Sequence, residues 1–293
     1  MPTPDAVPPD ATYRESMPSG PNPTGIEAYK PAEIARRIQA AGVDKVGLGM
    51  VQMTALSLLA GAFIAFGAAF YTGVMTGVDA GFGPARLLGG AAFSLGLILV
   101  VVGGAELFTG NALMVMAWVD RRIGTAAMLR AWLIVYLGNL VGALGMAVLV
   151  SLSGTLDGPA GALAVSIAEA KMALSPLEAF VRGILCNALV CLAVWLTFAA
   201  QSVAGKILAI LWPIAAFVAL GYEHSVANMY LIPVGLLNGA EGGLAGLVAN
   251  LVPVTLGNII GGAGGVALSY WAAYRRSAVE AGADSASGNV TDG

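Results

Sequence analysis

The chain of 293 residues contains a single histidine, His224, and this residue is the first candidate for chemistry. It lies in an apolar stretch beside Glu223, where an ionisable side chain at membrane depth is costly unless it faces water or a partner. Imidazole also changes its charge between about pH 5 and 8, which suits proton exchange with a weak acid. A functional role is therefore favoured over the alternative, an imidazole that is simply satisfied in the core.

A segment similar to the one around His224 occurs earlier in the chain. Residues 106–111 (Glu-Leu-Phe-Thr-Gly-Asn) and 223–228 (Glu-His-Ser-Val-Ala-Asn) both have a glutamate followed five residues later by an asparagine. A second pair, 137–142 (Leu-Gly-Asn-Leu-Val-Gly) and 256–261 (Leu-Gly-Asn-Ile-Ile-Gly), follows at an offset of 119 residues, against 117 for the glutamates. Two matches in nearly one register indicate an internal repeat.

Thr109 lies in the first of these segments and can donate or accept a hydrogen bond. It would face His224 if the two halves meet, and the alternative is a hydrogen bond to its own helix. The glutamates are predicted to hold free backbone amides, because carboxylates in an anion path would repel the anion. The supporting polar residues of the two segments are Glu106, Asn111, Glu223 and Asn228.

Lys171 stands in a stretch of small residues outside the long apolar runs. A basic residue in such a place could supply positive potential at the mouth of a pore, a role that Arg182 could share. The alternative is an ordinary solvated loop lysine. We therefore keep Lys171 as a candidate for the path of an anion.

The composition is that of a membrane protein. Hydrophobic residues make up 58% of the chain and charged residues 11%, with a mean hydropathy of +0.81, whereas a soluble domain has roughly a quarter charged residues. A helix needs about 20 apolar residues to cross a bilayer. The runs without Asp, Glu, Lys or Arg are 46–78, 87–105, 131–156, 183–205, 207–222 and 242–274. We predict an all-α, polytopic membrane protein with six transmembrane helices.

Two segments are too long for simple spans. Residues 87–119 and 207–240 would each measure about 50 Å as straight helices, against a hydrocarbon core of about 30 Å. Each carries one of the repeated glutamates, so we predict breaks at about 105–111 and 221–228. Three spans in each repeat give the halves opposite orientations, as in transport folds whose broken helices meet near the midplane.

The distribution of basic residues predicts the topology. With both termini in the cytoplasm, only Arg86, Lys171 and Arg182 fall on the other side of the membrane, which we expect to be the cytoplasmic (inner) membrane. Residues 1–45 are predicted to form a cytoplasmic tail, 46–276 the transmembrane channel domain and 277–293 a disordered cytoplasmic tail. The first tail is predicted to contain an amphipathic interfacial helix at 31–41 that stops at Gly42, or else a solvated helix without membrane contact.

Other kinds of chemistry are disfavoured. The sequence has no metal-ligand spacing such as HExxH or CxxC and no glycine-rich phosphate loop, so neither a metal, a cofactor nor ATP-driven pumping is expected. Cys186 and Cys191 lie five residues apart in one apolar run and are expected to be packing residues. The net charge of −3 gives no indication of a nucleic-acid partner.

Seven segments, in order, resemble the formate/nitrite transporter family across nearly the whole membrane region. They are 93–99, 104–109, 136–143, 182–187, 190–195, 221–229 and 250–262. The resemblance implies an aquaporin-like protomer that assembles as a homopentamer in the bilayer, with a separate pore in each protomer. It further implies transport of small monovalent weak-acid anions, formate or nitrite, with proton coupling at the central histidine, and no enzymatic activity.

The same resemblance implies roles for individual residues. The central histidine of the family corresponds to His224, and the threonine of the broken second helix corresponds to Thr109. A lysine and an asparagine that line the vestibule correspond to Lys171 and Asn187. The apolar constrictions on either side of the histidine would be Phe93, Leu97, Leu107 and Phe217.

The substrate stays open at this point. Residues 109–111 and Arg182 are similar to nitrite-type members, whereas the segment containing Pro253 is similar to formate channels. Hydrosulfide, acetate or lactate are alternative anions. A neutral-solute channel would share the architecture but should carry two Asn-Pro-Ala repeats, which are absent. A membrane enzyme is disfavoured, because one histidine without a carboxylate cluster makes a poor acid–base or metal centre.

Overall fold

The computed structural model describes residues 28–79 and 81–276, and every regular element within them is helical. Residues 1–27 of the tail predicted for 1–45, and the whole of the tail predicted for 277–293, lie outside the described residues. The elements are α2 (Pro31–Val46), α3 (Met50–Met75), α4 (Gly83–Gly103), η1 (Gly110–Met114), α5 (Val115–Val119), α6 (Thr125–Leu152), α7 (Pro159–Met172), α8 (Pro176–Ala199), α9 (Val203–Ala219), α10 (Ser225–Leu237), α11 (Gly243–Ile259), η2 (Ile260–Leu268), α12 (Ser269–Trp271) and η3 (Ala272–Arg276). The all-α prediction is confirmed.

Five helical stretches in the described ranges are long and apolar enough to cross a membrane. They are α3, α4, α6, α8 and the continuous stretch that begins with α11, Gly243–Tyr274. The helices α9 and α10 are shorter, and both are apolar. Because α10 follows α9 directly after a break, the pair is consistent with the sixth predicted span.

Both long segments are broken near their middle. After α4, Gly104 takes a left-handed φ of 80°, and helical structure resumes only with η1. After α9, Gly221 takes a φ of 72° before α10 begins. Glycine adopts this backbone region at little cost, whereas other residues are strained there. The two predicted breaks are therefore confirmed, and they span residues 104–109 and 220–224.

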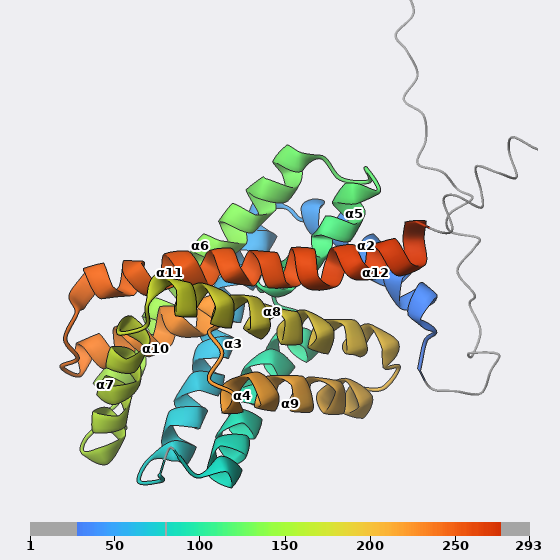
Figure 1. Ribbon diagram of the computed structural model, residues 1–293. Coiled ribbons are helices and arrows are strands. Elements are labelled where there is room, and N and C mark those ends of the chain that lie inside the picture. The colour runs from blue at the N-terminus through green and yellow to red at the C-terminus, as the bar shows by residue number, and fades with distance from the viewer. Residues whose placement is uncertain (1–27, 80, 277–293) are drawn as a thin grey trace, which may run out of the picture.

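The two halves of the chain have the same internal packing. In the first half α3 lies against both α4 and α6, and in the second α8 lies against both α9 and α11. Figure 1 shows these groups crossing, with α3, α4 and α6 running steeply through the view and α8, α9 and α11 running across it. Contacts of α4 with α9 and of α6 with α10 join the halves. The repeat predicted from two short motifs thus extends to whole helices.

Glycines bring the helices of each half into close contact at equivalent places. A Cβ on Gly142 of α6 would lie 2.1 Å from the Leu58 carbonyl oxygen of α3. A Cβ on Gly261, at the same position of the second motif, would lie 2.0 Å from the Ile184 carbonyl oxygen of α8. Small residues allow such approaches between membrane helices. Neither position has room for any side chain.

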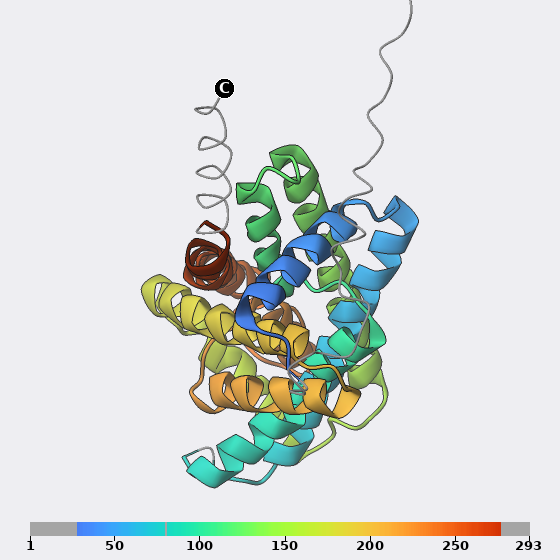
Figure 2. The same cartoon turned by 90° about the vertical axis from the view of Figure 1, so that its right-hand side faces the viewer.

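Helix α2 continues past its predicted stop at Gly42. A Cβ on this glycine would lie only 3.2 Å from the Ala117 Cβ, so the residue serves a helix contact and not a helix end. The apolar face of α2, including Ile34 and Ile38, is buried, and the helix packs against η1 and α5. Figure 2 shows α2, in blue, lying across the molecule. The face predicted to contact a membrane is occupied by the protein itself.

Helix α7 was not predicted, and its presence corrects the placement of Lys171. This lysine lies in the last turn of α7 and not in a loop. The helix packs against α10, where a Cβ on Gly235 would lie 2.3 Å from the Ala168 Cβ. The small residues that resembled a loop in the sequence are those that let α7 approach α10. Like α2 in the first half, α7 precedes the first long helix of its own half.

Two glycines of α6 provide a test of this packing. We expect Gly142→Ala to lower the Tm of the purified protein in detergent, because the new Cβ would overlap the α3 backbone and overpacking costs about 1–3 kcal/mol. The matched control is Gly145→Ala, because a Cβ there would meet nothing within 4 Å. Equal Tm values for the two variants would contradict the proposed contact between α3 and α6.

Candidate functional site

Asn139 on α6 holds the backbone of the first break. Its Oδ1 accepts a hydrogen bond from the Phe108 amide at 2.9 Å. Its Nδ2 donates to the carbonyl oxygens of Ser57 at 2.8 Å and Glu106 at 2.9 Å. The side chain is fully buried, so these backbone groups have no water to replace it. One side-chain amide therefore satisfies an N–H and a carbonyl that the interrupted helix leaves free, and ties them to the Ser57 carbonyl of α3.

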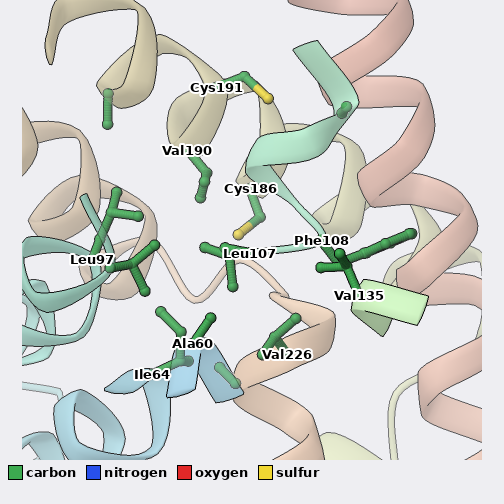
Figure 3. Close-up of a cluster of buried hydrophobic side chains, with 14 of the residues drawn as sticks. Ala60, Ile64, Leu97, Leu107, Phe108, Val135, Cys186, Val190, Cys191 and Val226 are labelled. Atoms are coloured by element: carbon green, nitrogen blue, oxygen red, sulfur yellow. The ribbon is translucent and has the colours of Figure 1, made fainter. Parts of the chain in front are cut away.

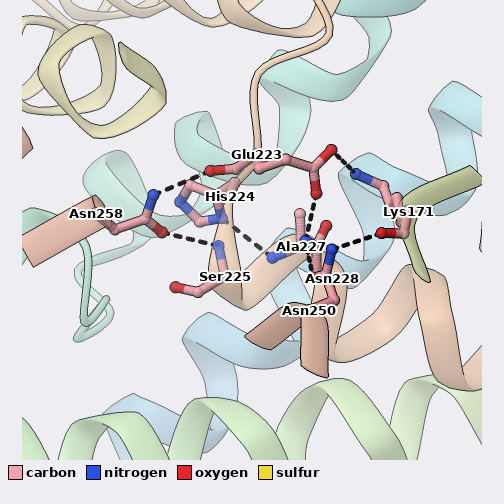
Figure 4. Close-up of polar contacts among 8 residues, drawn as sticks. All are labelled: Lys171, Glu223, His224, Ser225, Ala227, Asn228, Asn250 and Asn258. Atoms are coloured by element: carbon pink, nitrogen blue, oxygen red, sulfur yellow. Dashed lines mark hydrogen bonds and ion pairs between the residues drawn. The ribbon is translucent and has the colours of Figure 1, made fainter. Parts of the chain in front are cut away.

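Asn258 on α11 makes the same three bonds at the second break. It accepts a hydrogen bond from the Ser225 amide at 2.9 Å and donates to the carbonyl oxygens of Gly183 at 2.8 Å and Glu223 at 2.9 Å. Figure 4 shows Asn258 between its partners Glu223 and Ser225. Sequence reasoning assigned this task to the glutamates, and that prediction was wrong. The asparagine of the second repeated motif performs it in both halves.

The glutamate of the first break is bonded to side chains instead. Glu106 accepts a hydrogen bond from Asn111 Nδ2 at 2.9 Å through Oε2 and forms an ion pair with Lys45 Nζ at 2.6 Å through Oε1. Lys45, in the last turn of α2, was not predicted as a site residue. The sequence does contain a signal for it, because Lys45 precedes the first long helix of its half as Lys171 does in the second.

The second break has the equivalent cluster with one addition. Glu223 accepts a hydrogen bond from Asn228 Nδ2 at 2.6 Å and forms an ion pair with Lys171 Nζ at 2.8 Å. Asn250 links this cluster further, because it accepts from Asn228 at 2.7 Å and donates to the Lys171 carbonyl at 2.9 Å (Figure 4). The Lys171 side chain is 16% exposed, against 30% for Lys45, so the second ion pair is more deeply buried.

The two breaks meet at His224 and Thr109. His224 Nε2 lies 2.9 Å from Thr109 Oγ1, and both side chains are buried. The predicted contact is present in the structure, and the alternative of a Thr109 hydroxyl bonded to its own helix is not. The two residues come from segments 115 positions apart in the chain. Each break supplies one of them.

The second ring nitrogen of His224 fixes the tautomer of the neutral side chain. His224 Nδ1 accepts a hydrogen bond from the Ala227 amide at 3.0 Å and so caps α10. An accepting nitrogen carries no proton, so the neutral ring is protonated at Nε2 and donates to Thr109. Within the described residues no hydrogen bond uses the proton of the Thr109 hydroxyl, although Thr109 itself is buried and lines neither of the cavities described below.

Two residues of α8 contact the backbone carbonyl of Thr109. Asn187 Nδ2 donates to the Thr109 carbonyl at 3.1 Å and to the Asn258 carbonyl at 2.6 Å. The Cys191 thiol lies 3.5 Å from the same Thr109 oxygen. Asn187 was expected to line a vestibule, but it is buried where α8 meets η2 and lines neither of the two cavities described next. Cys186 and Cys191 are free and buried, as predicted.

A cavity lies on each side of the His224–Thr109 pair. We call the first the His224 cavity, of about 100 Å³, and the second the Glu106 cavity, of about 220 Å³. The His224 cavity is lined by residues that include Phe93, Lys171, Phe217, Gly221, Glu223 and His224. The Glu106 cavity is lined by residues that include Lys45, Leu97, Glu106, Leu107, Asn111 and Thr197. No residue lines both, and each cavity contains one Lys–Glu pair.

The predicted constriction residues line the two cavities, Phe93 and Phe217 the His224 cavity and Leu97 and Leu107 the Glu106 cavity. Phe217 packs edge-on against Phe93, with ring centroids 5.6 Å apart, and stacks on the His224 ring at 5.9 Å. On the other side, Leu97 and Leu107 belong to a buried apolar cluster (Figure 3). We therefore expect a solute that moves between the cavities to pass an apolar stretch formed by these side chains, next to the His224 imidazole and the Thr109 hydroxyl.

The sequence matches the family model described as "Formate/nitrite transporter" over residues 32–272. The chain belongs to this family. It is 40% identical to the formate channel FocA of Escherichia coli strain K12 over 269 residues, which cover 84% of this chain and 94% of that protein. It is 42% identical over 270 residues to a probable formate transporter of Methanothermobacter thermautotrophicus, covering 85% of this chain and 98% of that protein.

Solved structures of family members have the same fold. A chain described as an FNT family ion channel superposes with a TM-score of 0.77 at 33% identity, covering 82% of this chain and 98% of that chain. A pentameric formate channel with formate bound gives a TM-score of 0.70 at 36% identity, covering 77% and 97%. The aquaporin-like architecture with two broken helices is thus a property that this chain shares with its relatives.

The role of the asparagines at the breaks can be tested by replacing Asn258 with aspartate, which exchanges the side-chain NH2 group for an oxygen. We expect Asn258→Asp to lower the Tm in detergent, because a carboxylate still accepts from Ser225 but cannot donate to Gly183 and Glu223. The buried Glu223 carbonyl would lose its side-chain donor, at about 1–3 kcal/mol, and the Gly183 carbonyl would lose the bond that it accepts in addition to its helical one in α8. Gln201→Glu is the control, because it makes the same change at an exposed position whose side chain forms no hydrogen bond within the described residues. A Tm for Asn258→Asp equal to that of the control would contradict this role.

Proposed function

We propose that this chain transports small monovalent weak-acid anions, formate and nitrite, across a membrane through a pore within each protomer. One observation carries the proposal. The hydrogen-bonded pair of His224 and Thr109 lies between two cavities, and each cavity contains a lysine. Relatives at 40–42% identity are named formate channel and probable formate transporter, and a structural relative contains bound formate.

The cavities and the apolar stretch act on different forms of the solute. An anion can enter a cavity, where the lysine ammonium offsets the repulsion of the neighbouring glutamate. The apolar stretch disfavours a charge but admits a neutral acid. Thr109 and His224 can donate hydrogen bonds to the solute at the boundary between these environments. Protonation of the anion at this point would let it pass.

Proton coupling follows from the two nitrogens of His224. Uptake of a proton at Nδ1 breaks the bond from the Ala227 amide and converts the ring into a cation next to the solute. The cation can transfer its Nε2 proton to a carboxylate oxygen of formate, so that an N–H bond breaks and an O–H bond forms. Formic acid and a neutral ring protonated at Nδ1 result, and loss of the Nδ1 proton to water with uptake of another at Nε2 restores the ring that accepts from the Ala227 amide. The acid then leaves through the apolar stretch and releases its proton to water.

Assembly and location follow the relatives. We propose a homopentamer in the cytoplasmic membrane with both termini in the cytoplasm, on the basis of the pentameric structural relative and of the basic residues. The exposed leucines and valines of α6 and α11 are available for contacts with lipid or with neighbouring protomers.

We propose a transporter without enzymatic activity. Related anions, such as acetate, lactate or hydrosulfide, are the second choice of substrate, because the groups of the site recognise a single negative charge and do not distinguish these anions from formate.

Substitutions of His224 test the proton coupling. We expect His224→Asn and His224→Phe to lose the stimulation of formate uptake by external acid, because neither side chain titrates near neutral pH. Asparagine is a good helix cap and phenylalanine is not, so His224→Asn should keep a Tm nearer to that of the parent. The measurement is initial uptake into proteoliposomes between pH 5 and 8. Acid stimulation in a folded His224→Asn protein at the parental level would overturn the proposed coupling.

Lys171 is expected to act at short range. We predict that Lys171→Met lowers formate uptake at both low and high ionic strength, because a pair that is mostly buried is screened little by salt. A lysine exposed at the mouth of a pore, as the sequence suggested, would instead lose its effect on uptake at high salt. Lys206→Met is the control, because Lys206 lies on α9 and lines neither cavity. Full recovery of uptake by Lys171→Met at high salt would contradict the prediction.

A further inference from the structure

The charges inside the His224 cavity cancel. Its lysine, Lys171, is paired with Glu223 at 2.8 Å, and the neutral His224 ring adds no net charge. An anion approaching from solution therefore gains little long-range attraction from the cavity itself. Any net positive potential at the entrance must come from another residue.

Arg86, in the first turn of α4, lies next to this cavity. Its Nη2 is 3.6 Å from the position that a Cβ on Gly221 would occupy, and its charge interacts with the phenol of Tyr71. Gly221 and Tyr71 both line the cavity, whereas Arg86 does not. Since the Arg86 side chain is also partly exposed to solvent, it lies at the rim.

The guanidinium of Arg86 is not neutralised by a partner in the described part of the chain. None of the ion pairs found there includes it. The acidic residue nearest in sequence, Asp79, accepts a hydrogen bond from the Gly81 amide through its carboxylate. Arg86 differs in this respect from Lys45 and Lys171, which are both paired with a glutamate.

We propose that Arg86 is a specificity-determining residue for transport, the unpaired cation that attracts and first binds the anion at the rim of the His224 cavity. The inference rests on the proposed transport of formate and nitrite. A cation at a cavity entrance raises the local concentration of anions, and it does so without holding them in the constriction.

The second half of the repeat has no equivalent of this residue. The offset of 117 residues that relates the two glutamates places Val203, the first residue of α9, at the position of Arg86. The Lys–Glu pairs are duplicated, but the position of Arg86 is uncharged in the second half, where the nearest basic residue, Lys206, lies three residues further along α9 and lines neither cavity. The two entrances should therefore differ in their apparent affinity for anions, and the entrance beside Arg86 should have the higher affinity.

Uptake kinetics in proteoliposomes test the proposal with three variants, Arg86→Gln, Arg86→Lys and the control Arg182→Gln. Arg182 is a partly exposed cation on α8 whose charge acts on Glu178, and it does not line the His224 cavity. Initial rates are measured against formate concentration, and separately against nitrite, at low and high concentrations of an impermeant salt. The pH gradient is held constant.

We expect Arg86→Gln to raise the half-saturating concentration by about three- to tenfold at low salt, the lower end of electrostatic effects on association. The maximal rate should stay unchanged, Arg86→Lys should behave like the parent, and the difference should vanish at high salt as the Debye length falls to about 3 Å at 1 M.

Three results would overturn the role of Arg86. The first is an unchanged half-saturating concentration in Arg86→Gln, and the second is an equal effect of Arg182→Gln. The third is a loss of the maximal rate in Arg86→Gln that is the same at low and high salt and that Arg86→Lys shows as well. The last would indicate a structural role. Failure of the parent protein to take up either anion would overturn the proposed function together with this inference, and is thus distinguishable from the other outcomes.

Discussion

The need to satisfy free backbone groups at the two breaks governs the rest of this structure. A helix that stops inside an apolar environment leaves amides and carbonyls without partners, each at a cost of several kcal/mol in lipid. Asn139 and Asn258 meet that need with one acceptor and two donors apiece. An aspartate could accept but not donate, and a serine could not reach three groups. Asparagine at these positions follows from the free amide and free carbonyl of each break, together with the carbonyl of the neighbouring helix, Ser57 in α3 or Gly183 in α8, to which the break is tied.

The hydrogen bonds that satisfy the backbone at the breaks also position Thr109 and His224. Asn139 must reach the carbonyl of Ser57 on a neighbouring helix, so α6 and α3 have to approach closely, and Gly142 permits this approach. The same bonds fix the segment before Thr109, while Asn258 fixes the segment that contains His224. A hydrogen bond of 2.9 Å between two broken helices is thus a consequence of how each break is anchored on its own helix bundle.

The breaks and the facing of Thr109 and His224 were predictable, because segment length, a repeated glutamate and a lone histidine are all visible in the sequence. The role of Asn139 was not, since a motif match does not reveal which backbone groups a side chain reaches. Lys45 was overlooked because its distance of 61 residues from Glu106 depends on how α2 folds back. The small residues of α7 have no amphipathic pattern, so the context that turns Lys171 from a loop residue into a buried ion pair appears only in three dimensions.

Function arises where the repeat departs from its own symmetry. The offset of 117 residues aligns His224 with Leu107 and Thr109 with Val226, so each half contributes one polar and one apolar side chain in opposite order. Two identical halves would place either two imidazoles or none at the centre. Two would oppose each other as cations in acid, and none would leave no group to titrate. The observed alternation gives one imidazole with one hydroxyl as its partner, while Leu107 and Val226 join the same buried apolar cluster (Figure 3). The duplicated helices thus provide the two cavities and their Lys–Glu pairs. The two positions at which the halves differ, Leu107 against His224 and Thr109 against Val226, give the centre one polar and one apolar side chain from each half.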